Sequence, residues 1–578
     1  MTAAYDLVIR GGTVADGTGG PLYEADIAIR GGRIAEIGGV DGSGRAEIDA
    51  GGLLVTPGFV DIHTHYDGQA TWDSRLAPTS WHGVTTAVMG NCGVGFAPVR
   101  KEDHDRLIEL MEGVEDIPGA ALHEGLAWNW EGFPGYLDAL DARDRDIDLC
   151  AQLPHGALRV YVMGERGARL EPASEADIAQ MRHLTAEAMR AGAIGFSTSR
   201  TLNHRSVKGE PTPSLRATEA ELMGIALGLR DAGSGAIEMI SDFDQPDQAT
   251  EFAMIRRLVE ASGRPLSLSL AQAHRAPETW RRLMSRIDEA AGEGLALRAQ
   301  VAPRAIGLLL GLQASLNPFS GLPSYKAIAR QSFETRLAAL RDEGFRTRIL
   351  AEAERALAAE PRSRYLNFKM MFRLGDPVDY EPPEEEALVH LAARRGVSPA
   401  ELAYELLLED GGRQFLYQPF ANYAHYNLDA CGDMIGAANT VMGLGDGGAH
   451  VGIIADASYP TYLLTHWGRD RSRGKFPVEA LVKRQTADTA RAVGLEDRGQ
   501  LAPGFKADLN IIDFAELALE RPVMAFDLPA GGKRLLQKAR GYRHTFVSGI
   551  ETYRDGVATG ALPGRLVRGP QTARGEIL

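Results

Sequence analysis

The sequence lacks most features that mark exported or membrane-spanning proteins. Its 578 residues include only three cysteines, Cys92, Cys150 and Cys431, which are too few and too scattered for a disulfide framework. No run of about 18 apolar residues could span a membrane. The first residues show no basic segment followed by an apolar one, as a secretory signal would. We therefore expect a cytoplasmic protein that does not bind membranes.

Positive charge is also scarce. With 62 Lys and Arg against 77 Asp and Glu, the formal net charge is −15, so nucleic acid would be repelled on average. The glycine-rich stretch 90–95 is not accompanied by the lysine or spaced acidic residue of a nucleotide-binding loop. The expected partner is a small molecule, and the sequence leaves room for a homo-oligomer.

The two chain ends share a pattern of short strands separated by glycine turns. Residues 1–57 contain short alternating strands between glycine pairs, which is a hairpin pattern, and residues 507–513 and 544–549 return to it. We therefore expect one small β-sandwich domain built from both ends, over 1–57 and 498–578. The length of the chain favours such an addition to a large domain.

The middle of the chain alternates short apolar segments with amphipathic helical ones, such as 175–191, which is typical of repeated βα units. Eight such strands predict an α/β fold, a (β/α)₈ TIM-like barrel over 58–497, with its active site at the C-terminal strand ends. The predicted strands are 54–63, 85–92, 148–155, 194–199, 236–241, 265–270, 297–302 and 440–446.

The gap before the last predicted strand is longer than one barrel helix requires. Residues 303–439 contain two helical stretches, 332–357 and 384–409, with loops between them. We therefore expect an insertion near the barrel mouth.

The clearest chemical signal is Pro57-Gly58-Phe59-Val60-Asp61-Ile62-His63-Thr64-His65, an apolar strand that runs into two histidines. Side chains two apart on a strand share a face, so both imidazoles can converge on one ion. Neutral imidazole is a good ligand for divalent metals, zinc above all. The alternative is two polar residues at a strand end that bond to backbone or water. The pattern favours a zinc site, with other divalent metals left open.

This segment resembles the first barrel strand of the amidohydrolase superfamily. The opening 6–19 (DLVIRGGTVADGTG) and the later 497–509 (DRGQLAPGFKADL) are similar to the same superfamily. Gly90-Asn91-Cys92-Gly93 points to the branch of the N-acyl-D-amino-acid deacylases, or D-aminoacylases. The resemblance covers nearly the whole chain. It implies metal-dependent hydrolysis of a C–N amide bond, as in an N-acyl amino acid, with one or two zinc ions.

The resemblance implies roles for three residues at strand ends. Cys92, which alone is typical of a small buried hydrophobe, matches a thiolate metal ligand. Asp446 lies in a glycine-rich turn, where aspartate often only forms the turn. It matches a metal-binding aspartate that takes a proton from water activated by the metal and passes it to the leaving amine. His155 matches a histidine expected to contact substrate, or else to be structural.

The fifth and sixth predicted strands depart from the family pattern, which has a metal-binding histidine at the end of each. Glu238 stands where the first would align, and it is either a zinc ligand or a surface or helix-facing residue. Gln272 matches a family lysine that meets the substrate carboxylate, so it is a candidate substrate-binding residue. Arg200 is the candidate cation in place of that lysine. His274 is either a further ligand or an ordinary loop residue.

The ion count and the substrate class therefore stay open. One ion on His63, His65 and Asp446 is compatible with the pattern, as are two ions that share Cys92 with Glu238. Replacement of the family's lysine by Gln272 would remove a positive charge and weaken the binding of ordinary N-acyl amino acids, unless Arg200 supplies that charge. Hydrolysis of a cyclic amide, carbamate or ester on the same scaffold is the alternative, and a non-catalytic binding protein is a further one.

Overall fold

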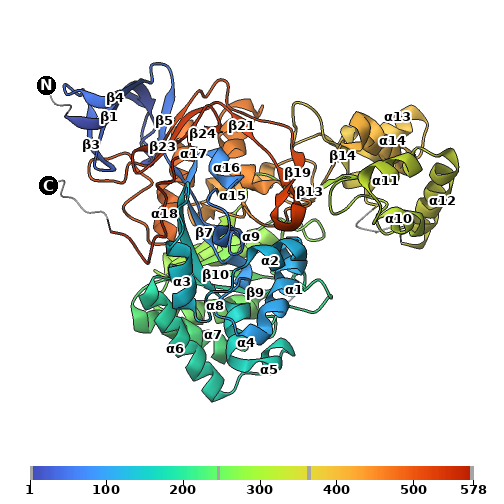
Figure 1. Cartoon of the computed structure of the whole chain (residues 1–578), viewed down its shortest axis with the longest axis horizontal. Helices are drawn as coiled ribbons and strands as arrows, with labels where there is room; N and C mark the ends of the chain where they lie inside the picture. Colours follow the sequence, from blue (N-terminus) through green and yellow to red (C-terminus); the bar gives the residue numbers. More distant parts are fainter. Residues whose placement is uncertain (1–3, 244–247, 361–365, 573–578) are drawn as a thin grey trace.

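The computed structural model describes residues 4–243, 248–360 and 366–572 (Figure 1). Its centre is an eight-stranded sheet in the order β16-β12-β11-β10-β9-β8-β7-β6, in which all neighbours are parallel. Each strand overlaps a predicted one, so the predicted barrel is confirmed. The strands are β6 (Phe59–Asp61), β7 (Val84–Met89), β8 (Asp148–Pro154), β9 (Gly195–Arg200), β10 (Ala236–Ser241), β11 (Leu266–Ser269), β12 (Leu297–Val301) and β16 (Thr440–Met442).

The barrel closes between its first and last strands, just beyond their ends. A parallel bridge joins Thr64 to Gly447. The amide of His65 donates to the carbonyl of Gly447 at 2.7 Å, and the amide of Asp446 donates to the carbonyl of His63 at 3.0 Å. Segments from opposite ends of the barrel sequence therefore form one seam.

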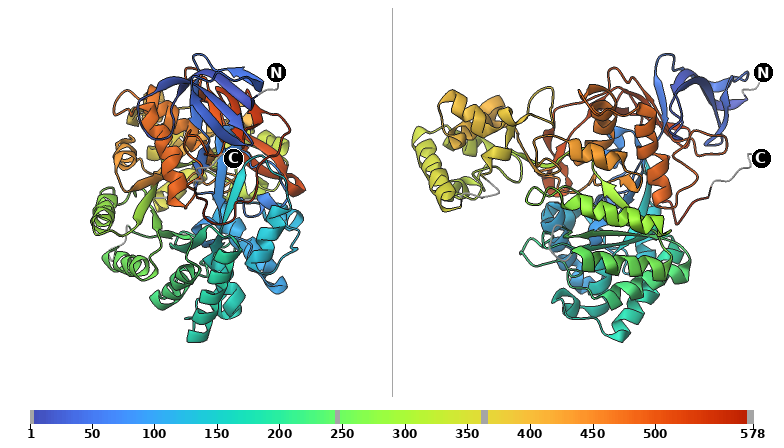
Figure 2. Two further views of the ribbon diagram at one scale, coloured as in Figure 1. Left: turned by 90° about the vertical axis from the view of Figure 1, so that its left-hand side faces the viewer. Right: turned by 180° about the vertical axis from the view of Figure 1, so that it is seen from behind.

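Amphipathic helices cover the outside of this barrel (Figures 1 and 2). The helix predicted over 175–191 is confirmed as α6, which begins with a capping box between Ser174 and Asp177 and ends at the left-handed Gly192. Among the described residues, no helix combines the length and apolar character needed to cross a membrane. The helices between the middle strands are α6 (Glu175–Ala191), α7 (Glu219–Ala232), α8 (Gln248–Ser262) and α9 (Thr279–Gly292).

The predicted strand 54–63 is two strands, which is a correction. β5 (Leu54–Pro57) pairs with β1 (Tyr5–Val14) and β17 (Leu509–Ile512), whereas β6 opens the barrel. Gly58 lies between the two, and a side chain does not fit there because a Cβ would lie 2.1 Å from Oγ1 of Thr85 on β7. The close approach of β7 therefore explains the glycine at this point of the chain.

Both chain ends contribute to one nine-stranded sheet, as predicted. Its order is β24-β23-β22-β17-β5-β1-β2-β3, and β4 pairs with β1. The exact limits of this domain stay a prediction, and residues 1 and 578 lie outside the described residues. The remaining strands are β2 (Tyr23–Arg30), β3 (Arg33–Gly38), β4 (Gly44–Asp49), β22 (Tyr542–Val547), β23 (Ile550–Arg554) and β24 (Val557–Ala558).

The insertion forms a helical lobe beside the barrel, with an apolar core of its own (Figures 1 and 2). The helical stretches predicted over 332–357 and 384–409 are confirmed, and each contains two helices. Asp342 caps a second helix in the first stretch, and Gly396, at φ 70°, ends a helix in the second. The helices are α10 (Pro323–Ile328), α11 (Phe333–Leu340), α12 (Glu343–Ala359), α13 (Leu388–Arg395) and α14 (Pro399–Gly412).

A buried ionic cluster joins the base of the barrel to the chain's C-terminal part. Nη1 of Arg498 and Nζ of Lys506 lie 2.6 Å and 2.7 Å from Oδ2 of Asp148, the first residue of β8. Asp497 and Asp508 complete the cluster. Burial alone would raise the pKa of Asp148, but Lys506 and Arg498 lower it to about 2. The charged residues of the 497–509 motif therefore attach one part of the fold to another.

Asp148→Asn is expected to lower the free energy of unfolding by on the order of 3 kcal/mol, because it leaves buried cations without their partner. The folded-state pKa of Asp148 is depressed, so its contribution is present above about pH 4 and is lost as the pH falls toward 2. Urea denaturation at pH 7 and pH 3 measures both effects. Asp138→Asn is the control, because Asp138 forms an exposed ion pair with Arg568. It is expected to lower the free energy of unfolding by less than about 1 kcal/mol. Equal losses in the two variants would contradict this role.

Candidate metal centre

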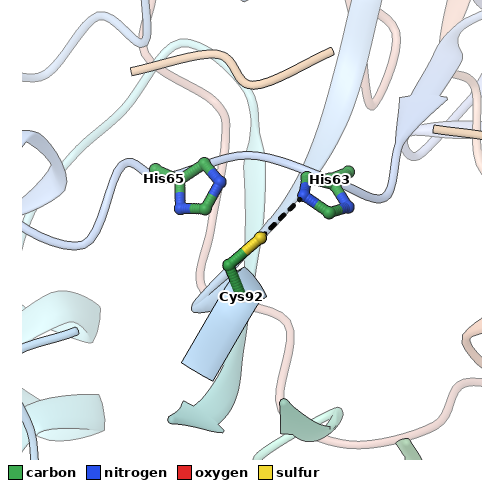
Figure 3. Close-up of side chains that lie close together, drawn as sticks. All are labelled: His63, His65 and Cys92. Carbon is green, nitrogen blue, oxygen red and sulfur yellow. Dashed lines mark hydrogen bonds between the residues drawn. The ribbon is translucent and has the colours of Figure 1, made fainter. Parts of the chain in front are cut away.

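Three buried side chains meet where the first two barrel strands end (Figure 3). One ligand atom from each of His63, His65 and Cys92 lies within 4.8 Å of the others. Nε2 of His63 is 3.4 Å from Sγ of Cys92. The two histidines follow β6, and Cys92 lies in a short turn after β7 at φ 55°. The structure thus brings together the histidine pair and the cysteine.

Asp446 adds a carboxylate to the same point. Its Oδ1 lies 3.3 Å from Nε2 of His63 and 3.5 Å from Nε2 of His65. Ligand atoms at about 2.0–2.1 Å from a tetrahedral zinc stand about 3.3 Å apart, so these separations suit an ion between them. Two imidazoles, a thiol and a carboxylate are also the ligand types that zinc prefers.

The protonation states of these groups suit ligands. Burial lowers the pKa of His65 to about 4, which leaves its imidazole neutral near pH 7. Burial alone would raise the pKa of Asp446, but contacts with His65 and His63 hold it below its usual value. Burial and nearby carboxylates, Glu238 first among them, raise the pKa of Cys92. A thiolate at Cys92 therefore needs a cation beside it.

The turn that carries Asp446 is conformationally strained. Leu444, Asp446 and His450 have φ values of 60°, 47° and 48°, in the left-handed region that non-glycine residues rarely adopt. Gly447 is required between them, since a Cβ there would lie 2.1 Å from Oγ1 of Thr79. Such strain clusters at functional sites, where the surrounding structure holds it in place.

Glu238 lies inside the barrel beside Cys92 and is 2% exposed, so the surface alternative does not hold. Its Oε2 accepts a hydrogen bond from the amide of Cys92 at 2.9 Å, and its Oε1 lies 3.4 Å from Oγ of Ser269. Burial raises its pKa. Glu238 therefore faces the cysteine end of the site, and its role as a metal ligand stays a prediction.

The predicted substrate-binding residues all form hydrogen bonds or ion pairs with other groups of the protein. Nδ1 of His155 lies 2.8 Å from Oγ1 of Thr198, and its Nε2 lies 3.0 Å from Oε1 of Glu221. Arg200 binds Glu251 through Nε at 2.5 Å and Nη2 at 3.2 Å. Contact with substrate by either residue stays a prediction. Both ring nitrogens of His155 are already engaged, whereas the guanidinium of Arg200 keeps further N–H donors.

Gln272 and His274 lie at the end of the sixth strand. The Gln272 side chain accepts from the amide of Ala424 at 3.1 Å and donates to the carbonyl of Pro277 at 3.3 Å. Burial, with His425 nearby, lowers the pKa of His274 to about 4. Substrate binding by Gln272 and metal binding by His274 both stay open.

Two residues that the sequence did not predict lie next to the histidines. Oε1 of Gln300, on β12, lies 2.7 Å from Nδ1 of His63, and Oε1 of Glu115 lies 3.4 Å from Nδ1 of His65. Gln300 lies in a predicted barrel strand, so strand alternation could have indicated that it faces inward. Glu115 ends an ordinary amphipathic helix, and no local pattern marks it.

Comparisons with known proteins agree with this architecture. A model described as "Amidohydrolase family" matches residues 46–553. D-aminoacylase of Alcaligenes xylosoxydans xylosoxydans is 26% identical over 568 residues, which are 97% of this chain and 97% of that protein. N-acyl-D-aspartate deacylase of the same organism is 36% identical over 197 residues, 34% of this chain and 37% of that protein.

A solved structure has the same fold. It is N-acyl-D-glutamate deacylase from Bordetella bronchiseptica, complexed with zinc and a phosphonate inhibitor, at a TM-score of 0.64 and 24% identity. The match covers 98% of this chain and 99% of that one. At this identity the match shows the shared fold alone.

Metal content per chain is expected to be one to two zinc equivalents in the wild type and lower in His63→Ala, because the variant removes a converging imidazole. Elemental mass spectrometry on protein prepared without chelators and supplied with zinc measures it. The exposed His183 on α6 provides the control, since His183→Ala leaves the site intact. Absence of zinc from the wild type would favour the non-catalytic alternative.

Proposed function

The chain belongs to the amidohydrolase family, and on this premise we propose that it uses a divalent metal ion to hydrolyse a C–N bond in an N-acyl amino acid or a related amide. The observation that carries the proposal is the buried convergence of His63, His65, Cys92 and Asp446 at the C-terminal ends of the barrel strands. The named relatives, which are D-amino-acid deacylases, support the choice of bond. Family membership and this donor set together argue against a non-catalytic protein.

The donor set would hold the ion as follows. His63, His65 and Asp446 would bind one ion, and Cys92 and Glu238 are available to it or to a second ion. Zinc is the first expectation, and other divalent metals remain open. A bound divalent ion would polarise the scissile carbonyl and lower the pKa of a water molecule.

Asp446 is the proposed general base and acid. The contacts with His65 and His63 that lower its pKa keep it a carboxylate near pH 7, ready to accept a proton. Its Oδ1 faces the two histidines, which leaves Oδ2 to take the proton from the attacking water. Oδ2 then gives this proton to the leaving nitrogen, so the amine departs neutral.

Asp446→Asn is expected to lower kcat by about 100- to 10,000-fold, because an amide cannot accept the proton. Zinc content should stay near the wild-type value, since the amide oxygen remains a weak ligand beside His63 and His65. Steady-state kinetics on N-acetyl-D-amino acids, together with elemental analysis, measure both quantities. A near-normal kcat would contradict the assignment.

A second candidate, hydrolysis of a cyclic amide, carbamate or ester, is favoured by one observation. Both groups expected to meet a substrate carboxylate are engaged elsewhere, Arg200 with Glu251 and Gln272 with backbone groups. A substrate without a free carboxylate would leave these contacts undisturbed.

Masking the substrate carboxylate separates the two candidates. For an N-acyl amino acid substrate, conversion of the carboxylate to a methyl amide should lower kcat/KM by about 10- to 100-fold, the value of one hydrogen bond to a charged group. For the second candidate, masking should have no effect or raise kcat/KM. Parallel assays of each free acid and its methyl amide provide the matched comparison.

A further inference from the structure

Glu115 is a buried carboxylate that no step above uses. It is the last residue of α1 (His104–Glu115) and is 1% exposed. Neither carboxylate oxygen has a hydrogen-bond partner among the described residues. An unpaired charge in such a place is strongly unfavourable unless nearby groups compensate for it. Its neighbours therefore indicate what it does.

The first neighbour is His65. Oε1 of Glu115 lies 3.4 Å from Nδ1 of His65, while Nε2 of the same ring faces Oδ1 of Asp446 at 3.5 Å. His63 is oriented in a similar way, with Nδ1 hydrogen-bonded to Oε1 of Gln300 at 2.7 Å and Nε2 toward Cys92, whereas the longer separation between His65 and Glu115 is not a hydrogen bond in this structure. Each imidazole thus turns Nε2 to the centre and Nδ1 to an outer acceptor. Histidines that bind metals usually donate their second N–H to such an acceptor, which fixes the tautomer and strengthens the ligand.

The second neighbour is His450, in the turn that follows Asp446. Oε2 of Glu115 lies 3.5 Å from Nε2 of His450, and the amide of His450 donates to the main-chain carbonyl of Glu115. The next residue, Asp116, accepts from the amide of Gly452 at 3.1 Å. The end of α1 is therefore anchored to the strained turn, and the Glu115 carboxylate links this anchor to His65.

We propose that Glu115 is a positioning residue of the metal centre, which keeps the proton of His65 on Nδ1 so that the Nε2 lone pair faces the ion. Through His450 it also couples His65 to the turn that presents Asp446. This inference rests on the proposed function, since it requires that the centre bind a metal ion. Glu115 acts through the two histidines and does not itself bind the ion or the substrate.

Zinc affinity tests the role directly. Glu115→Gln keeps the shape of the side chain but removes its charge, and it is expected to raise the zinc Kd by about 10- to 100-fold. Glu112→Gln is the matched control, because Glu112 lies one turn earlier on α1 and accepts from the amide of Gly119 at 3.0 Å. Its zinc Kd should equal that of the wild type. Competition with a chromogenic chelator measures all three proteins, and thermal unfolding verifies that each is folded.

The outcomes distinguish this inference from the proposed function. An unchanged zinc Kd in folded Glu115→Gln would overturn the role of Glu115, whereas zinc binding and amide hydrolysis by the wild type would leave the proposed function in place. A wild type that takes up no zinc would overturn both.

A crystal structure of the zinc-loaded wild type decides the question if Glu115→Gln does not fold. Zinc at about 2.0–2.1 Å from Nε2 of His65, with Nδ1 hydrogen-bonded to Glu115, supports the role. Zinc bound to Nδ1 of His65, or to Glu115 itself, overturns it.

Discussion

The closure of the barrel is the constraint on which the candidate site depends. The two hydrogen bonds of the seam, from His65 to Gly447 and from Asp446 to His63, join residues at opposite ends of the barrel sequence. They place the main chain of two histidines and one aspartate close together. Main-chain pairing thus preorganises these proposed ligands, and the remaining freedom is in the side-chain rotamers. The strain in the turn at Asp446 is the cost of presenting its carboxylate at this seam.

Buried carboxylates gather around the seam. Burial raises the pKa of Asp61 to about 7 and also raises the pKa of Glu115 and Glu238. These carboxylates surround imidazoles such as His65 that burial keeps neutral. Ionised carboxylates are costly to bury without a compensating positive charge, and a divalent ion at the convergence point would supply it. The same electrostatics would bring the Cys92 thiol to its ionised form.

The motifs that pointed to the family have different physical roles. The charged residues of 497–509 join the base of the barrel to the C-terminal part through Asp148, so this motif reports how the fold is assembled. Gly90-Asn91-Cys92-Gly93 and the turn at Asp446 instead present Cys92 and Asp446, two of the proposed metal ligands, at the opposite, C-terminal ends of the strands. A resemblance based on both kinds of motif therefore predicts the fold and the site independently.

Local pattern alone determined the eight barrel strands, the shared sheet of the two chain ends and the common face of His63 and His65, because alternation and βα repetition act over neighbouring residues. Only the tertiary structure decided that Arg200 forms an ion pair with Glu251 and that Glu115 lies against His65. It also decided the division of 54–63 into β5 and β6, which pair with strands of two different sheets. Such contacts arise when the barrel closes and brings distant segments together, and no periodicity within a single segment encodes them.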